Sequence, residues 1–156
     1  MAMEIERKFL VVGDGWRVGA KGVSYRQGYI RTENKTTVRV RIAGEQGFLT
    51  LKGKSNASGL SREEFEYEIP KADAKAMLAS MCGPEQVEKT RYKVKVGGHT
   101  WEVDEFHGEN EGLIVAEIEL QAEEETFEKP DWAGKEVSDD RRYGNSNLGK
   151  TPYKTW

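Results

Sequence analysis

The sequence predicts a mainly β fold of the α+β class, an eight-stranded antiparallel β-barrel with a few helices packed outside it. Three observations support this prediction. Apolar and polar residues alternate with period two through most of the chain. The breaks between these stretches are short and rich in turn residues, which favours antiparallel neighbours. Only one segment departs clearly from the alternation and has helical spacing.

Eight segments show the alternation that is typical of half-buried strands. The expected strands are residues 3–12, 23–31, 36–43, 47–53, 62–69, 86–96, 99–106 and 113–121. Turn sequences such as GDG at 13–15, GG at 97–98 and HGENEG at 107–112 separate them. Eight strands are enough to close a barrel wide enough for one small ligand.

The expected helix covers residues 71–81, between the fifth and sixth strands. This segment is rich in alanine, and Met77, Leu78 and Met81 recur in it at helical spacing. Gly83 follows shortly afterwards, as is common where a helix ends.

The C-terminal segment, residues 122–156, has no clear strand pattern and is expected to form a helical or irregular tail that packs on the barrel. Trp132 and Tyr143 are the expected packing anchors of this tail. At 156 residues the chain has the size of one domain, so we expect residues 1–156 to form a single unit.

Composition argues against several classes of function. There are 24 Lys and Arg against 27 Asp and Glu, and a net charge of −3 gives no global basic field for nucleic acid or an anionic membrane. The single cysteine, Cys82, excludes an internal disulfide and suits a reducing compartment. No run approaches the ~20 apolar residues of a membrane span, and the N-terminus lacks the apolar stretch of a signal peptide. We therefore expect a cytoplasmic protein that binds neither nucleic acid nor a membrane.

One motif near the C-terminus suggests a nucleotide site. Residues 144–151, GNSNLGKT, match the G-x-x-x-x-G-K-T pattern of a phosphate-binding P-loop. Such a loop needs a buried strand before it and a helix after it, but Pro152 follows directly and the preceding residues are polar. We interpret the motif as a chance match in a surface tail.

Charged residues gather on one face of almost every expected strand, because residues i and i+2 of a strand share a face. Acidic residues dominate this face on the first, fifth, seventh and eighth strands, and basic residues dominate it on the third, fourth and sixth. The charged positions are Glu4, Glu6 and Lys8; Arg39 and Arg41; Lys52; Arg62, Glu64, Glu66 and Glu68; Lys89, Arg91, Lys93 and Lys95; Glu102 and Asp104; Glu117 and Glu119.

Two interpretations of this charged face are open. A sheet face in contact with solvent is the usual meaning of such alternation. However, Glu, Lys and Asp are depleted in strands, and a surface that serves only solubility would mix both signs along each strand. If the face instead lines the interior, carboxylates roughly 6–7 Å apart along a strand can converge on a hard divalent cation. Opposing Arg and Lys side chains would bind phosphate oxygens, so this interpretation favours a polyphosphate–metal complex.

Several motifs together resemble the CYTH superfamily, the triphosphate tunnel metalloenzymes. The first is EIERKF, an E-x-E-x-K strand near the N-terminus. The others follow in the order that the family shows: VRVR at 38–41, TLKGK at 50–54, REEFEYEI at 62–69, KTRY at 89–92, WEVDEF at 101–106 and AEIEL at 116–120. The resemblance covers residues 3–120 and is specific because the motifs recur jointly. The ending RYGNSNLGKTPY is similar to the tail of the short bacterial members, the tripolyphosphatase-like ones.

The resemblance implies that the barrel forms a tunnel, which binds a triphosphate together with Mg²⁺ or Mn²⁺. The implied metal ligands are Glu4, Glu6, Asp104, Glu117 and Glu119. The implied phosphate-binding residues are Lys8, Arg39, Arg41, Lys52, Arg62, Lys89 and Arg91. Glu4, Glu6 and Lys8 are implied to be catalytic, together with Glu64 and Glu66, which would hold a second metal ion or position water. Lys150 of the tail is a further candidate at the tunnel mouth.

The implied activity is metal-dependent hydrolysis of a triphosphate, with inorganic tripolyphosphate as the favoured substrate. Within the same family, a thiamine triphosphatase and a class IV adenylyl cyclase are alternatives. A polyphosphate-binding module without catalysis is another, although the intact acidic residues argue against it because they would oppose simple anion binding. An ordinary barrel with a solvated polar face is the last alternative. The expected partner is a small-molecule triphosphate, and the sequence leaves a homodimer open.

Overall fold

A computed structural model describes residues 3–156 of the chain. The strands are β1 (Met3–Val11), β2 (Gly22–Ile30), β3 (Thr37–Ala43), β4 (Gln46–Lys52), β5 (Ser61–Ile69), β6 (Val87–Val96), β7 (His99–Phe106), β8 (Ile114–Glu119) and β9 (Ala133–Glu136). The α-helices are α1 (Lys71–Ser80) and α2 (Asn145–Lys150), and the short 3₁₀ helices are η1 (Gly15–Arg17), η2 (Gly108–Asn110), η3 (Arg141–Tyr143) and η4 (Tyr153–Thr155).

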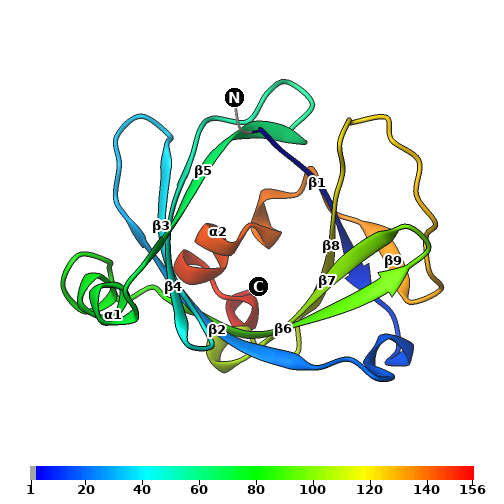
Figure 1. Cartoon of the computed structure of the whole chain (residues 1–156), viewed down its shortest axis with the longest axis horizontal. Coiled ribbons are helices and arrows are strands. Elements are labelled where there is room, and N and C mark those ends of the chain that lie inside the picture. The colour runs from blue at the N-terminus through cyan, green and yellow to red at the C-terminus, as the bar shows by residue number, and fades with distance from the viewer. Residues whose placement is uncertain (1–2) are drawn as a thin grey trace.

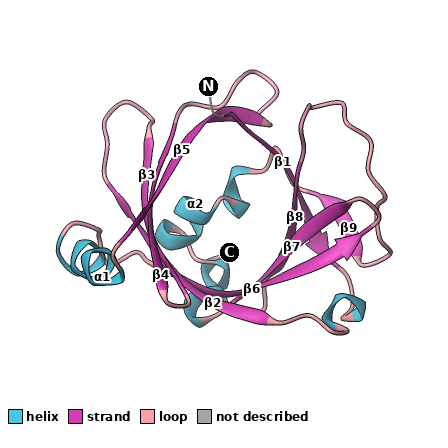
Figure 2. Ribbon diagram, in the orientation of Figure 1, coloured by secondary structure: helices cyan, strands magenta, loops and turns pink. Residues whose placement is uncertain are grey.

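The strands form one antiparallel sheet that closes on itself. The order of strands is β5-β4-β3-β2-β6-β7-β8-β1-β9, and an additional pairing of β5 with β1 closes the ring of β1 to β8. Figure 1 looks into this ring, and Figure 2 shows how little helix surrounds it. The eight-stranded antiparallel barrel that the sequence predicts is therefore confirmed.

Strand β1 holds the closure together because it pairs with three other strands. Residues 3–5 pair with β5, residues 6–10 pair with β8, and Phe9 and Val11 pair with β9. Strand β9 is not predicted from the sequence, because its four residues, AGKE, are too few to show alternation. The expected helix at residues 71–81 is confirmed as α1.

Two apolar cores lie outside the barrel wall. Helix α1 covers the outer face of β3 and β4, where Ala74 and Leu78 pack on the fully buried Val40. On the opposite side, Trp101 of β7 lies beneath Trp132, with their ring centroids 5.4 Å apart in an edge-to-face arrangement. The outer apolar residues of the alternating strands therefore anchor the flanking segments, which leaves the inner face to the charged residues.

A third core lies at the end of the barrel where the C-terminal segment crosses it. There Val87, Phe106 and Val115 contact Tyr143 and Leu148 of the tail. Figure 1 shows α2 behind the opening of the ring. This corrects the expectation that residues 144–151 belong to a surface tail, because Leu148 is 0% exposed. The segment also lacks P-loop geometry, since it forms α2 itself and follows η3 instead of a strand.

No helix within residues 3–156 is long and apolar enough to cross a membrane.

Replacing Leu148 by Ala should lower the free energy of unfolding by about 2–5 kcal/mol, because the change leaves a cavity where the tail meets the barrel. Urea unfolding followed by tryptophan fluorescence measures this loss. Val18→Ala is the control, since Val18 is 89% exposed, and it should change the stability by less than about 0.5 kcal/mol. Equal stability of the two variants would contradict the packing of Leu148 against the end of the barrel.

Candidate functional site

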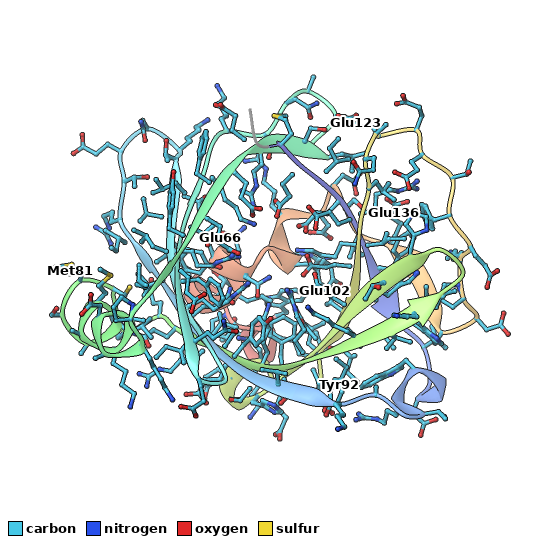
Figure 3. The ribbon with its side chains drawn as sticks, viewed as in Figure 1. Glu66, Met81, Tyr92, Glu102, Glu123 and Glu136 are labelled. Atoms are coloured by element: carbon cyan, nitrogen blue, oxygen red, sulfur yellow. The ribbon has the colours of Figure 1, made fainter. Side chains whose placement is uncertain are left out.

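The barrel encloses a cavity of about 510 Å³ whose lining is mostly charged. Figure 3 shows Glu66 and Glu102 inside the ring, whereas Tyr92 and Glu136 lie outside it. The charged face of the sequence pattern is therefore the interior of the barrel and not a solvated outer surface. Of the predicted site residues, those that line the cavity are Glu4, Glu6, Lys8, Arg39, Arg41, Lys52, Arg62, Glu64, Glu66, Arg91, Glu117 and Glu119.

The sheet order separates the two signs of charge into two walls. The acidic strands β5, β1, β8 and β7 are consecutive around the ring, and the basic strands β6, β3 and β4 are separated only by β2. We call these the acidic wall and the basic wall. The sorting of charge by strand in the sequence thus becomes a cavity with one acidic and one basic side.

The acidic wall crowds carboxyl groups that repel one another. Glu6 of β1 lies within hydrogen-bonding reach of Glu117 of β8. Burial, followed by the negative charges of Glu117 and Glu4, raises the pKa of Glu6 well above its usual value. Burial also raises the pKa of Glu117, but the positive charges of Lys8 and Arg91 outweigh it and hold that pKa well below its usual value. One carboxyl of this pair therefore favours the protonated form while the other stays ionised.

A second carboxyl pair lies next to the first. Burial, followed by the charge of Glu4, raises the pKa of Glu64. Burial opposes ionisation of Glu4, but Lys52, with Glu64 and Arg62, lowers the pKa of Glu4 to about 2. The Lys52 ammonium lies 2.9 Å from Glu4 and 3.3 Å from Glu64. This lysine bridges the acidic wall to the basic strand β4.

The basic wall contains a buried cation that has no carboxylate partner among residues 3–156. Arg41 is 8% exposed, and its Nε donates to the amide oxygen of Gln27 at 2.9 Å. Burial, followed by the positive charges of Arg39 and Arg91, lowers the pKa of Arg41 to about 10. Within the part of the chain that the structure describes, the buried Nε of Arg39 also has no hydrogen-bond partner. Both guanidinium groups line the cavity, so the basic wall is short of negative charge.

Two predicted residues lie behind the cavity surface. Lys89 donates to Asp104 at 2.7 Å, and Arg91 makes a bidentate contact to the same carboxylate at 2.7 and 2.8 Å. Neither Lys89 nor Asp104 lines the cavity. This arrangement does not favour direct phosphate contact by Lys89 or metal ligation by Asp104, because both side chains lie behind the residues that line the cavity. It makes Asp104 the anchor of Arg91.

Three other candidates have defined places. The Glu66 carboxylate accepts from Arg39 at 3.1 Å and from the Thr50 hydroxyl at 2.7 Å, so it is held on the basic side. Burial, followed by the charge of Glu4, raises the pKa of Glu119 at the acidic wall. Lys150 does not line the main cavity, but an adjoining one of about 500 Å³.

Sequence reasoning missed two groups of cavity residues. Tyr25 and Tyr29 of β2 line the basic side, and their spacing at i and i+4 of an expected strand could have indicated a shared face. Asn145 and Ser146 of α2 line the end of the cavity. No local pattern indicates these two residues, because their place depends on where the tail crosses the barrel.

The acidic wall offers oxygen ligands of the kind that Mg²⁺ and Mn²⁺ prefer. Within residues 3–156 no three acidic, histidine or cysteine side chains are already grouped as a metal cluster. In the Glu6–Glu117 and Glu4–Glu64 pairs, burial and then the neighbouring negative charge raise one pKa, and a divalent ion between such carboxylates would relieve the repulsion. The donor set therefore fits a hard divalent cation.

Comparisons with known sequences identify related proteins. The chain matches the sequence profile of the CYTH domain over residues 2–152. It is 54% identical over 156 residues to an inorganic triphosphatase of Acetivibrio thermocellus, an alignment that covers 100% of this chain and 99% of the relative. An inorganic triphosphatase of Nitrosomonas europaea is 38% identical over 151 residues, which cover 93% of this chain and 95% of the relative.

Solved structures agree with these sequence matches. The crystal structure of an inorganic triphosphatase has a TM-score of 0.65 at 36% identity and covers 96% of this chain and 95% of its own. A protein from Pyrococcus horikoshii has a TM-score of 0.58 at 20% identity, covers 78% of this chain and 81% of its own, and shares the fold.

Replacing Arg41 by Met should raise the melting temperature of the ligand-free protein, because it removes a buried cation that has no carboxylate partner. The same change should weaken the rise in melting temperature that sulfate or phosphate produces in the wild type, because anion binding stabilises only the folded state. Differential scanning calorimetry at several anion concentrations measures both effects. Arg26→Met, on the exposed side of β2, is the matched control and should keep the full anion response. A full response in Arg41→Met would exclude Arg41 from anion binding.

Proposed function

The chain belongs to the CYTH domain family, and from this premise we propose that it hydrolyses inorganic tripolyphosphate to pyrophosphate and phosphate. The observation that carries the proposal is the buried Arg41, a cation without a carboxylate partner among residues 3–156, which faces a wall of excess carboxylates. A linear polyanion with a divalent cation supplies the missing charge on both sides. The names of the related inorganic triphosphatases support the same choice of substrate.

The basic wall binds and orients the substrate in this proposal. Arg39 and Arg41 extend from β3, and Arg91 extends from β6, so phosphate oxygens between them would receive N–H donors from two directions. Ion pairs and hydrogen bonds hold Arg39 and Arg91 in place before the substrate arrives. Little reorganisation is then needed when charge develops on the departing phosphate.

Lys8 is a cation of the acidic wall that would reach the substrate in this proposal. Burial opposes its charge, but Glu117 and Glu6 outweigh this effect and raise the pKa of Lys8. Its ammonium also donates to the carbonyl of Tyr143 at 3.2 Å, which holds it at the end of the cavity that the tail closes. Lys8 therefore stays charged and can bind an oxygen of the terminal phosphate.

Glu4, Glu6, Glu117 and Glu119 would hold the divalent cation. When bound, Mg²⁺ or Mn²⁺ supplies positive charge that neutralises phosphate oxygens and lowers the pKa of bound water. Glu64 would orient the attacking water, because it lies beside Glu4, whereas Glu66 is engaged by Arg39 and Thr50. Water approaching from the acidic side would then be opposite the phosphates on the basic side.

Several finer features remain predictions. They are the preference for Mg²⁺ or Mn²⁺, the cytoplasmic location, the homodimer that the sequence leaves open, and the absence of nucleic-acid and membrane partners. A thiamine triphosphatase, a class IV adenylyl cyclase and a binding module without catalysis are the rival activities, and one substrate panel separates all three from the proposal.

The purified protein should release phosphate from tripolyphosphate with Mg²⁺ or Mn²⁺, faster than from ATP, thiamine triphosphate or pyrophosphate. Colorimetric phosphate release measures these rates, and cyclic AMP is assayed in the ATP sample. Cyclic AMP would move the chain to the cyclase class, and faster turnover of thiamine triphosphate would change the substrate. Tight binding of tripolyphosphate without turnover of any compound would leave a binding module.

Replacing Glu4 or Glu6 by Gln should lower metal-dependent kcat by at least about a hundredfold, because each change removes a carboxylate from the proposed metal site. Glu68→Gln is the matched control: Glu68 continues the inward-facing row of β5 but does not line the cavity. Activity close to wild type in Glu6→Gln would contradict its assignment as a metal ligand.

A further inference from the structure

Asn145 lies between the buried Lys89 and the cavity. It is the first residue of α2, and its Oδ1 accepts a hydrogen bond from the Lys89 ammonium at 2.9 Å. Lys89 is 1% exposed and does not line the cavity, whereas Asn145 does. Asn145 is therefore a polar residue that contacts this buried cation on one side and lines the cavity on the other.

The contact with Lys89 fixes which way the Asn145 amide points. An ammonium group has three donors and no acceptor, so only the oxygen of the amide can face it. The two N–H donors of Nδ2 must then point elsewhere, and no other group in residues 3–156 accepts a hydrogen bond from them. Because Asn145 lines the cavity, its surface toward the cavity offers hydrogen-bond donors.

The donors of Asn145 lie beside the basic wall. The ring of Tyr25 has Arg41 at 4.8 Å, Arg91 at 5.1 Å and the Lys89 ammonium at 5.9 Å from its centroid. Lys89 and Arg91 also donate to the same Asp104 carboxylate, so the amide bonded to Lys89 lies near Arg91, and Arg41 lines the same cavity. A phosphate oxygen held by those arginines would come within reach of a neutral donor at the end of the cavity.

We propose that Asn145 is a substrate-binding residue that donates an Nδ2 hydrogen bond to a phosphate oxygen, and that Lys89 is a positioning residue that holds the amide in this orientation. The inference rests on the proposed function, because it takes the ligand to be a polyphosphate. It also gives the GNSNLGKT segment a role at phosphate through one side chain, without the backbone cradle of a P-loop. The rival explanation is that Asn145 only ties the tail to Lys89.

Asn145→Asp separates these two explanations. Aspartate has the same shape and still accepts from Lys89, so the tail stays anchored, but both donors are replaced by a charged acceptor. We expect the KM for tripolyphosphate to rise about tenfold or more, while the melting temperature stays at or above that of the wild type. Asn147→Asp adds the same charge two residues further along α2, where the side chain contacts the Arg141 carbonyl, and should change KM by less than about threefold. An unchanged KM in Asn145→Asp, or an equal rise in both variants, would overturn the proposal.

A double-mutant cycle tests the positioning role of Lys89. If Lys89 acts on binding through Asn145, Lys89→Met should raise KM in the wild-type background and add little in an Asn145→Ala background. The same fold-increase in both backgrounds would show that Lys89 acts independently, and it would overturn the positioning role. Each variant is compared at a temperature at which its fluorescence shows a folded protein.

A binding measurement without catalysis keeps this inference distinct from the proposed function. In protein labelled with ¹⁵N-asparagine, tripolyphosphate without metal should shift the side-chain amide signals of Asn145, identified by their loss in Asn145→Asp, and leave those of Asn147 in place. Binding that leaves the Asn145 signals unmoved would overturn this inference alone. Failure of tripolyphosphate to bind, with or without Mg²⁺, would overturn the proposed function together with it.

Discussion

A barrel that turns its charged strand faces inward must supply almost every buried charge with a partner, and the rest of this structure depends on that constraint. Lys52 meets Glu4 and Glu64, and Arg91 meets Asp104 and Glu117. Lys52 of β4 thereby contacts both β1 and β5, and Arg91 of β6 contacts both β7 and β8. The ion pairs therefore fix the relative positions of the two walls as well as neutralising them.

The pairing is incomplete where a ligand would bind. Arg41 has only the neutral Gln27 as a side-chain hydrogen-bond partner within the described residues, and its own pKa is depressed by burial and by neighbouring arginines. On the other side, Glu6 is pushed toward its protonated form by burial and by Glu117. The free energy of unfolding is therefore lower than it would be with every interior charge paired. A ligand that carries both a polyanion and a cation would pair these charges and stabilise the folded protein.

The part of the site that could be predicted from sequence follows from one geometric rule. The two-residue period of a strand assigned Glu4, Arg39 and Glu117 to the same inner face, because side-chain direction alternates along any strand. The rule carries no information about depth behind the surface, so it could not distinguish Asp104, which lies behind the wall, from Glu102, which lines it. The motifs taken together indicated the family, but they too carry no information about how deeply a side chain lies behind the cavity surface.

The C-terminal tail is a second part of the site that the sequence pattern does not predict. Asn145 reaches the cavity only because Leu148 of the same short helix packs into the end of the barrel, and the sequence GNSNLGKT contains no period from which that crossing could be predicted. Strand β9 was missed for a related reason, since its four residues are defined by pairing with β1 and not by their own composition. Both features are long-range and become visible only in three dimensions.

The pairing of the first strand has a consequence for how the chain folds. Residues 6–10 of β1 find their neighbours in β8, more than a hundred positions later in the sequence, and residues 9 and 11 find theirs in β9. Contacts of such high sequence separation form late and slow the folding of β-rich domains, since a large loop must close first. During synthesis, Glu6 and Lys8 leave the ribosome among the first residues, but their β8 neighbours are made more than a hundred residues later, whereas Glu4 can pair with β5 earlier. The acidic wall is therefore complete only after β8, at residues 114–119, has been made.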